Sequence, residues 1–162
     1  ILVIVFMLVY YKGLGIYSAI GLIVYVILFW GTISAIGAVL TLPGIAGIIL
    51  TIGMAVDANV IIFERIKEEI IKGKSSRIAI NDGFKHALST IIDSNVTTLI
   101  TAGALYIFGT GPIKGFAVTL SLGVIISMTV SLLFNRSIIF LMSGIPKLNT
   151  PGFLGVRREV GI

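Results

Sequence analysis

The sequence contains no cysteine, one histidine, one tryptophan and few charged residues. Without cysteine the chain can form neither a disulfide framework nor a thiolate site. Charged residues make up 12% of the chain and apolar residues 57%, and the mean hydropathy is +1.12. This composition excludes an ordinary soluble domain. Because apolar runs long enough to cross a bilayer recur along the chain, it predicts an all-α integral membrane protein.

The net charge of +5 does not indicate nucleic-acid binding. The lysines and arginines lie in the short segments between apolar runs, a placement typical of membrane topology rather than of a nucleic-acid surface. If segment 64–92 is cytoplasmic, all of the 12 basic residues except Lys114 lie on the cytoplasmic side. We therefore expect an external N-terminal end and a cytoplasmic C-terminus.

The apolar runs predict four full spans and one truncated span. The sequence begins at Ile1 inside an apolar run, so we expect an internal fragment that forms a single transmembrane domain over residues 1–162. Between the third and fourth spans, apolar residues at helical spacing in segment 75–92 predict a short cytoplasmic amphipathic helix at the membrane interface, and the fourth span starts within this helix. The predicted spans are 1–11 (truncated), 14–40, 44–63, 95–108 and 116–142.

Small and polar residues recur at helical spacing in three of these spans and indicate faces that meet other helices. We expect the three spans to pack as a group with these stripes turned inward, although ordinary close packing explains the two uncharged stripes equally well. The stripes are Ala46, Gly53, Asp57 and Glu64 in the third span, Ser94, Thr97, Thr98 and Thr101 in the fourth, and Gly115, Thr119, Gly123, Ser127 and Ser131 in the fifth.

Asp57 is the candidate functional residue, because it lies about 10 Å inside Glu64 along the helix axis. A charged aspartate at such depth costs about 2.5–3.5 kcal/mol on insertion scales. A carboxyl group there can take up a proton from one side and release it to the other, with Thr97, Thr98 and Thr101 as candidate hydrogen-bonding partners. The alternative is a structural aspartate bonded to the same threonines.

The other polar residues have ordinary interpretations. Asn59 lies about 200° around the helix from Asp57, so we expect it to hydrogen-bond a different neighbouring helix. Asp93 is placed to cap the helix that follows it, and His86 lies on the amphipathic segment without a cluster of ligands around it.

Two enzyme interpretations have weak support, and of these an intramembrane aspartyl protease is the remoter alternative function. An intramembrane aspartyl protease needs two carboxyl groups close together, but Asp93 lies near the interface rather than at the depth of Asp57. The glycine-rich segment 109–115 lacks the spacing of a phosphate-binding loop. We therefore expect no catalytic residue, no cofactor and no metal.

Two long segments of the chain resemble a known family. These are TLPGIAGIILTIGMAVDANVIIFERIKEE (41–69) and DSNVTTLITAGALYIFGTGPIKGFAVTLSLGV (93–124). They closely resemble the membrane domain of the SecD/SecF family, accessory subunits of the Sec translocase. A SecF sequence would carry an Asn-Asp pair followed by FDRIREN where this chain has VDANVIIFERIKEE, so the resemblance is to the SecD side of the family.

The resemblance implies a helix bundle of the RND (resistance–nodulation–division) type, with the first helix and the periplasmic domain outside this chain. It also implies a location in the cell inner (plasma) membrane, pairing with SecF, and action after the SecYEG translocon on a translocating polypeptide. The coupling ion would be a proton or sodium, and the conserved membrane aspartate of the family corresponds to Asp57. A small-molecule exporter of the same superfamily is the alternative.

Overall fold

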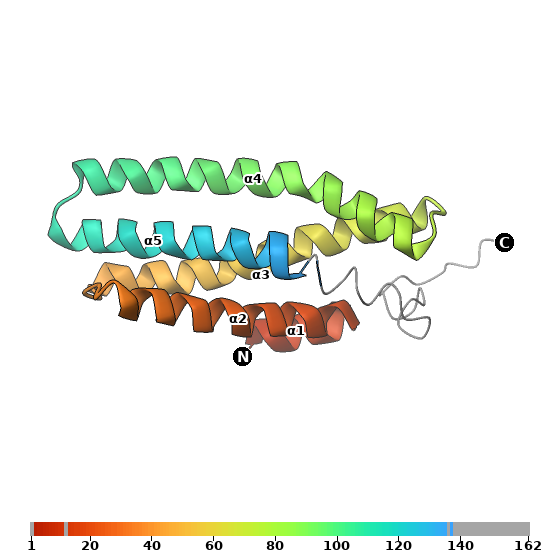
Figure 1. Ribbon diagram of the computed structural model, residues 1–162, viewed down its shortest axis with the longest axis horizontal. Helices are drawn as coiled ribbons and strands as arrows, with labels where there is room; N and C mark the ends of the chain where they lie inside the picture. Colours follow the sequence, from red (N-terminus) through yellow and green to blue (C-terminus); the bar gives the residue numbers. More distant parts are fainter. Residues whose placement is uncertain (1, 12, 136, 138–162) are drawn as a thin grey trace.

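The computed structural model describes residues 2–11, 13–135 and 137, and these residues form helices without any strand. The helices run side by side, with α4 along one side of the bundle and α1 and α2 along the other (Figure 1). The predicted fifth span beyond residue 137 and the tail 145–162 lie outside the described residues. The elements are α1 (Leu2–Tyr11), α2 (Gly13–Ala35), α3 (Leu42–Ile71), α4 (Ser76–Phe108), α5 (Gly111–Thr129) and the π-helix η1 (Val130–Asn135).

Local sequence signals set the ends of α3 and α5. The Thr41 hydroxyl accepts a hydrogen bond from the Gly44 N–H at 3.1 Å, and Pro43 follows in the first turn of α3. The same hydroxyl donates to the Pro112 carbonyl at 3.2 Å and so joins the starts of α3 and α5. After α3, Gly73 has a φ of 86°, a left-handed conformation that glycine adopts without strain.

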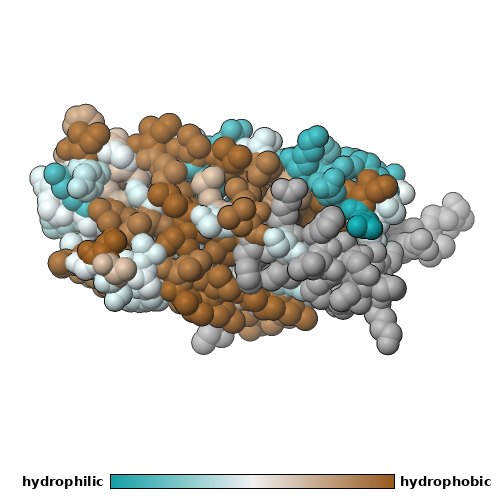
Figure 2. Space-filling model, in the orientation of Figure 1, coloured by the Kyte–Doolittle hydropathy of each residue, from teal (hydrophilic) through white to brown (hydrophobic). Residues whose placement is uncertain are grey.

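Four of the described helical segments are long and apolar enough to cross a membrane: α2, α3, α4, and α5 with its extension to Leu133. This confirms the four predicted full spans. Apolar residues cover most of the visible surface, and hydrophilic residues gather toward the end where α3 and α4 are joined (Figure 2). The lipid-compatible surface and the charged segment predicted from the sequence are therefore separated along the bundle axis.

Helix α3 occupies the centre of the bundle, where it packs against α2, α4 and α5. Its inward positions are small residues where helices approach closely and large apolar residues near its C-terminal half. Thr51 and Ile62 are completely buried, and Phe63 is almost so. The exposed positions of α3 therefore lie along one remaining face.

The segment between the third and fourth spans is helical on both sides of its turn. Helix α3 continues beyond Phe63 to Ile71, and segment 76–92 is the first half of the unbroken helix α4, in agreement with a fourth span that starts within the preceding helix. Its apolar side packs on α3, where a Cβ atom at Gly83 would lie 2.7 Å from the Ile66 backbone. The extension of α3 provides an apolar surface for α4, so this side is covered by protein rather than by the membrane interface.

Candidate functional site

Asp57 lies in the apolar part of α3, on the face that the other helices leave exposed. Its neighbours on this face are aliphatic, with Ile49 68% exposed and Leu50 48% exposed. Gly53, one turn before Asp57, is also exposed, and a Cβ atom there would meet nothing within 4 Å. The carboxylate therefore stands within an apolar outer surface of this chain.

The expected inward orientation of this stripe is wrong for this chain. Ala46, Gly53 and Asp57 point outward because α2, α4 and α5 cover the other sides of α3. Gly53, predicted to support close helix packing, contacts no other described helix. Only Glu64, at the charged end of the stripe, is half-buried, and it pairs with Lys67 at 3.1 Å.

The threonines predicted to serve Asp57 form hydrogen bonds within their own helix. Thr97, Thr98 and Thr101 each donate to the carbonyl four residues earlier on α4, at 2.9, 3.0 and 3.0 Å. Among the described residues no hydrogen bond or ion pair reaches the Asp57 carboxylate. A role for these hydroxyls in an ion path remains a prediction.

The small-residue stripe of α5 lies against α3. A Cβ atom at Gly115 would lie 2.4 Å from the Thr41 hydroxyl oxygen, and one at Gly123 would lie 2.5 Å from the Thr51 Cβ. Between them, a Cβ atom at Gly47 would lie 2.5 Å from the Thr119 hydroxyl. The two backbones therefore approach closely because at each crossing a glycine of one helix faces a threonine of the other.

A polar seam joins α2 to the side of α3 opposite Asp57. The Tyr25 hydroxyl donates to the Thr51 hydroxyl at 2.8 Å, and the Asn59 side-chain amide donates to the Ser18 hydroxyl at 3.1 Å. All four side chains are buried. The sequence predicted a helix-bonding role for Asn59 but missed its partners. A tyrosine within an apolar span was the available signal, because a buried tyrosine hydroxyl usually finds a hydrogen-bonding partner.

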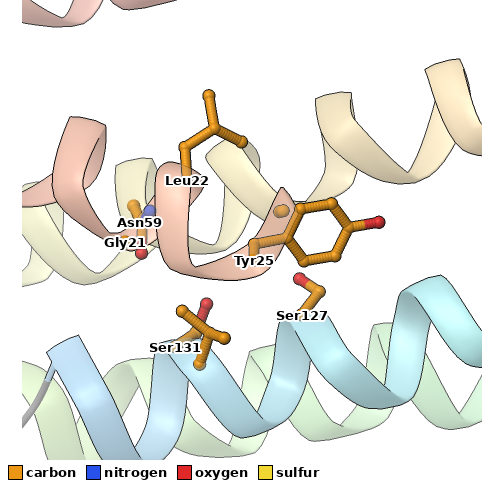
Figure 3. Close-up of a pocket in the computed structure, with 8 residues that line it drawn as sticks. Gly21, Leu22, Tyr25, Asn59, Ser127 and Ser131 are labelled. Carbon is orange, nitrogen blue, oxygen red and sulfur yellow. The ribbon is translucent and has the colours of Figure 1, made fainter. Parts of the chain in front are cut away.

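A narrow pocket lies beside this seam, between α2, α3, α5 and η1. In Figure 3, Ser127 and Ser131 point toward the α2 segment that carries Gly21 and Tyr25. The pocket has no room for a water molecule. It is lined by Gly21, Leu22, Tyr25, Ala55, Asn59, Ser127, Val130 and Ser131.

A second polar cluster lies where α3 turns into α4, beyond the apolar part of the bundle. The Glu69 side chain is 2% exposed, and its two carboxylate oxygens lie 2.5 Å from the Lys72 and Lys74 ammonium groups. His86 on α4 lies 3.5 Å from the same carboxylate, and Lys74 also pairs with Asp82 at 2.6 Å. Lys72 first, and then Lys74, hold the pKa of Glu69 at about 2, well below its ordinary 4.5.

This lowered pKa predicts acid sensitivity of the α3–α4 hairpin. Because the folded-state pKa lies below the unfolded value, the carboxylate stabilises the hairpin fully above about pH 4.5, and this stabilisation is lost as the pH falls toward about 2. We expect hydrogen-exchange protection factors of residues 76–87 to fall across that range. Glu69→Gln should lower protection at pH 7 and remove this part of the pH dependence.

Glu68→Gln is the matched control, since Glu68 pairs with Arg65 at 2.9 Å on the exposed side of the same turn. Exposed ion pairs contribute little, so this variant should keep the wild-type protection. Equal losses in both variants would contradict the role assigned to the buried carboxylate.

The fold and the site define a class: a helical integral membrane protein whose central helix carries a carboxylate within an apolar face. The family model of the C-terminal part of the protein export membrane proteins SecD and SecF matches residues 1–144. The chain therefore belongs to the SecD/SecF family. This agrees with the resemblance found in segments 41–69 and 93–124.

Individual relatives agree with the family assignment. The chain is 52% identical over 155 residues to the protein translocase subunit SecD of Acidaminococcus fermentans and 56% identical over 137 residues to that of Desulfurispirillum indicum. These alignments cover 96% and 85% of this chain, but 37% and 27% of the relatives.

A solved structure agrees as well. The fold is similar to the crystal structure of SecDF, a translocon-associated membrane protein from Thermus thermophilus, with a TM-score of 0.86 and 44% identity. The similarity covers 90% of this chain and 20% of the solved chain. The chain therefore corresponds to a minor part of each of these proteins.

Proposed function

We propose that this chain is the membrane part of an accessory subunit of the Sec protein-export machinery. In this proposal it works with SecF, after the SecYEG translocon, and uses a proton or sodium gradient to drive late translocation of secreted polypeptides. The observation that carries the proposal is the position of Asp57 on the apolar outer face of α3, in a chain of the SecD/SecF family. The proposed activity is transport by ion coupling, without a catalytic residue or a cofactor.

The exposed position of Asp57 supports pairing with another membrane subunit. A charged carboxylate facing lipid is costly, by about 2.5–3.5 kcal/mol on insertion scales, and this cost falls when a cationic or hydrogen-bonding partner covers it. The face around it is apolar and offers Gly53 as a point of close approach. We infer that SecF covers this face and supplies the charge partner of Asp57.

We also propose a topology in the inner membrane, with the α3–α4 hairpin and the C-terminus in the cytoplasm. The hairpin carries most of the charged groups described, whereas the opposite end of the bundle carries Lys114 alone, in the first turn of α5. Cysteines placed at Lys74 and Lys114 should react with a membrane-impermeant maleimide from opposite sides. Reaction of both from one side would contradict this orientation.

The proposed function is tested by reconstituting the full-length subunit with SecF and SecYEG in vesicles. Completion of polypeptide translocation should accelerate when a proton or sodium gradient is imposed and return to the basal rate when an ionophore dissipates it. A translocation rate that is independent of both gradients would contradict ion coupling. Gradient-driven efflux of small molecules without any effect on polypeptides would favour an exporter instead.

A further inference from the structure

We propose that Tyr25 and Asn59 are positioning residues, which hold α3 in the rotation that directs Asp57 out of the bundle. The proposal rests on the proposed ion-coupling function for its purpose, but its geometry stands on the described residues alone. It assigns a role to the polar seam between α2 and α3.

The two hydrogen bonds of the seam act at separate points of one antiparallel helix pair. Ser18 pairs with Asn59, and seven residues further along α2 Tyr25 pairs with Thr51, eight residues earlier on α3. Seven to eight residues correspond to about two helical turns, or about 10–12 Å. Two bonds this far apart oppose both rotation and sliding of α3, which a single bond could not do.

The seam and Asp57 lie on different sides of α3. At 3.6 residues per turn, Asn59 lies about 200° and Thr51 about 120° around the helix from Asp57, measured in the same sense. Asn59 and Asp57 are also only two residues apart, at nearly the same depth. Any rotation that changes what Asp57 faces must therefore stretch or break the bonds to Ser18 and Tyr25.

The pocket beside the seam gives α3 a second set of polar partners. Ser127 and Ser131 line the same pocket as Asn59 and Tyr25, on the α5 side (Figure 3). A small rotation of α3 exchanges the Asn59 bond to Ser18 for one to these hydroxyls without leaving a polar group in hydrocarbon. The π-helix η1 begins at Val130 in the wall of this pocket, and π-helical turns are frequent at functional sites.

The seam is therefore a latch between two rotations of α3, and protonation of Asp57 shifts the balance between them. Thr51 also packs against Gly123, so the same residue connects the latch to α5. Loss of one interhelical hydrogen bond in a membrane raises the population of the rotated state about 3- to 18-fold.

The test follows the rotated state with a cysteine at Ala55 in the full-length subunit, assembled with SecF and containing no other cysteine. Ala55 lines the pocket and is 5% exposed, so N-ethylmaleimide should label this cysteine only when α3 rotates. Tyr25→Phe and Asn59→Ala should each accelerate labelling about 3- to 18-fold. Tyr25→Phe removes only a hydroxyl, so it preserves the packing of the ring against Phe29.

Two controls separate the latch from general loosening of the bundle. A cysteine at Ala117 on α5, which is 1% exposed, should keep its slow labelling in both variants. The reciprocal exchange Ser18→Asn with Asn59→Ser should restore slow labelling at Ala55. Unchanged labelling at Ala55, or equal acceleration at Ala55 and Ala117, would overturn the proposal.

The link to ion coupling has a separate readout. Imposing an ion gradient should change the labelling rate at Ala55 in the wild type but not in Asp57→Asn. If the variants accelerate labelling while the gradient has no effect, the latch stands and the proposed ion coupling fails. If the gradient changes labelling while the variants do not, the ion coupling stands and the latch proposal fails.

Discussion

Replacing Gly123 with leucine is expected to prevent the full-length subunit from reaching a stable folded state. Even a Cβ atom at this position would lie 2.5 Å from the Cβ and Cγ2 atoms of Thr51 and 2.6 Å from its hydroxyl oxygen. Thr51 cannot move away, because it is fully buried and bonded to Tyr25 and to the Ile48 carbonyl. An overpacking substitution in a well-packed core typically costs about 1–3 kcal/mol, so Gly123→Ala should already lower the melting temperature markedly.

The measurement is thermal unfolding in detergent together with the yield of folded protein. Gly103→Leu on α4 is the matched control, since a Cβ atom there meets nothing within 4 Å. The pair Thr51→Gly with Gly123→Ala should recover part of the stability by exchanging the small residue across the contact. Full stability of Gly123→Leu would show that α3 and α5 are not held at this distance.

Asp57→Asn is expected to abolish the acceleration of translocation by an ion gradient while leaving the fold and the assembly with SecF intact. Asparagine has nearly the same size and can hydrogen-bond, but it cannot exchange a proton. Moving one charge through a potential of 100 mV is worth about 2.3 kcal/mol, which corresponds to about a 50-fold shift between two states. We expect the stimulated rate of Asp57→Asn to equal the rate without a gradient.

One control changes a carboxylate outside the apolar face, and a second keeps a carboxylate at position 57. Asp93→Asn changes an exposed residue on α4 and should keep the gradient response, and Asp57→Glu should restore part of it because it can titrate. Blue-native electrophoresis checks the assembly with SecF in each variant. A normal gradient response in Asp57→Asn would mean that the carboxyl group is structural and that the proposed mechanism is wrong.

The amino-acid pattern was sufficient for the helices and for the residue at the centre of the site, but not for the direction in which that residue points. Hydropathy located four spans, and the depth of Asp57 within an apolar run identified it. The stripe containing Gly53 and Asp57 was expected to face inward, because a polar residue in a membrane helix normally meets another helix. The described helices leave that face of α3 exposed, because α2, α4 and α5 pack on its other sides.

The hydrogen-bonding pairs of the seam between α2 and α3 were not predicted from the sequence. Ser18 and Tyr25 lie seven residues apart on one face of a largely apolar span, but this spacing does not identify their partners. Their pairing with Asn59 and Thr51 depends on the antiparallel register of two helices, which hydropathy does not encode. The helical extension of α3 through residues 64–71 was not predicted, because hydropathy shows only that this charged segment leaves the hydrocarbon.

The hydroxyl groups of α4 and α5 bear on how the chain is built into a membrane. Thr97, Thr101, Ser121 and Thr129 all donate to carbonyls of their own helix, so each group is already satisfied when its helix enters hydrocarbon alone. Tyr25 and Asn59, in contrast, use hydroxyls on another helix. Helices α4 and α5 can therefore enter the membrane one at a time. Helices α2 and α3 are more stable in hydrocarbon when they enter together as a hairpin, because each then satisfies polar groups of the other. The order in which these helices are synthesised therefore affects their pairing.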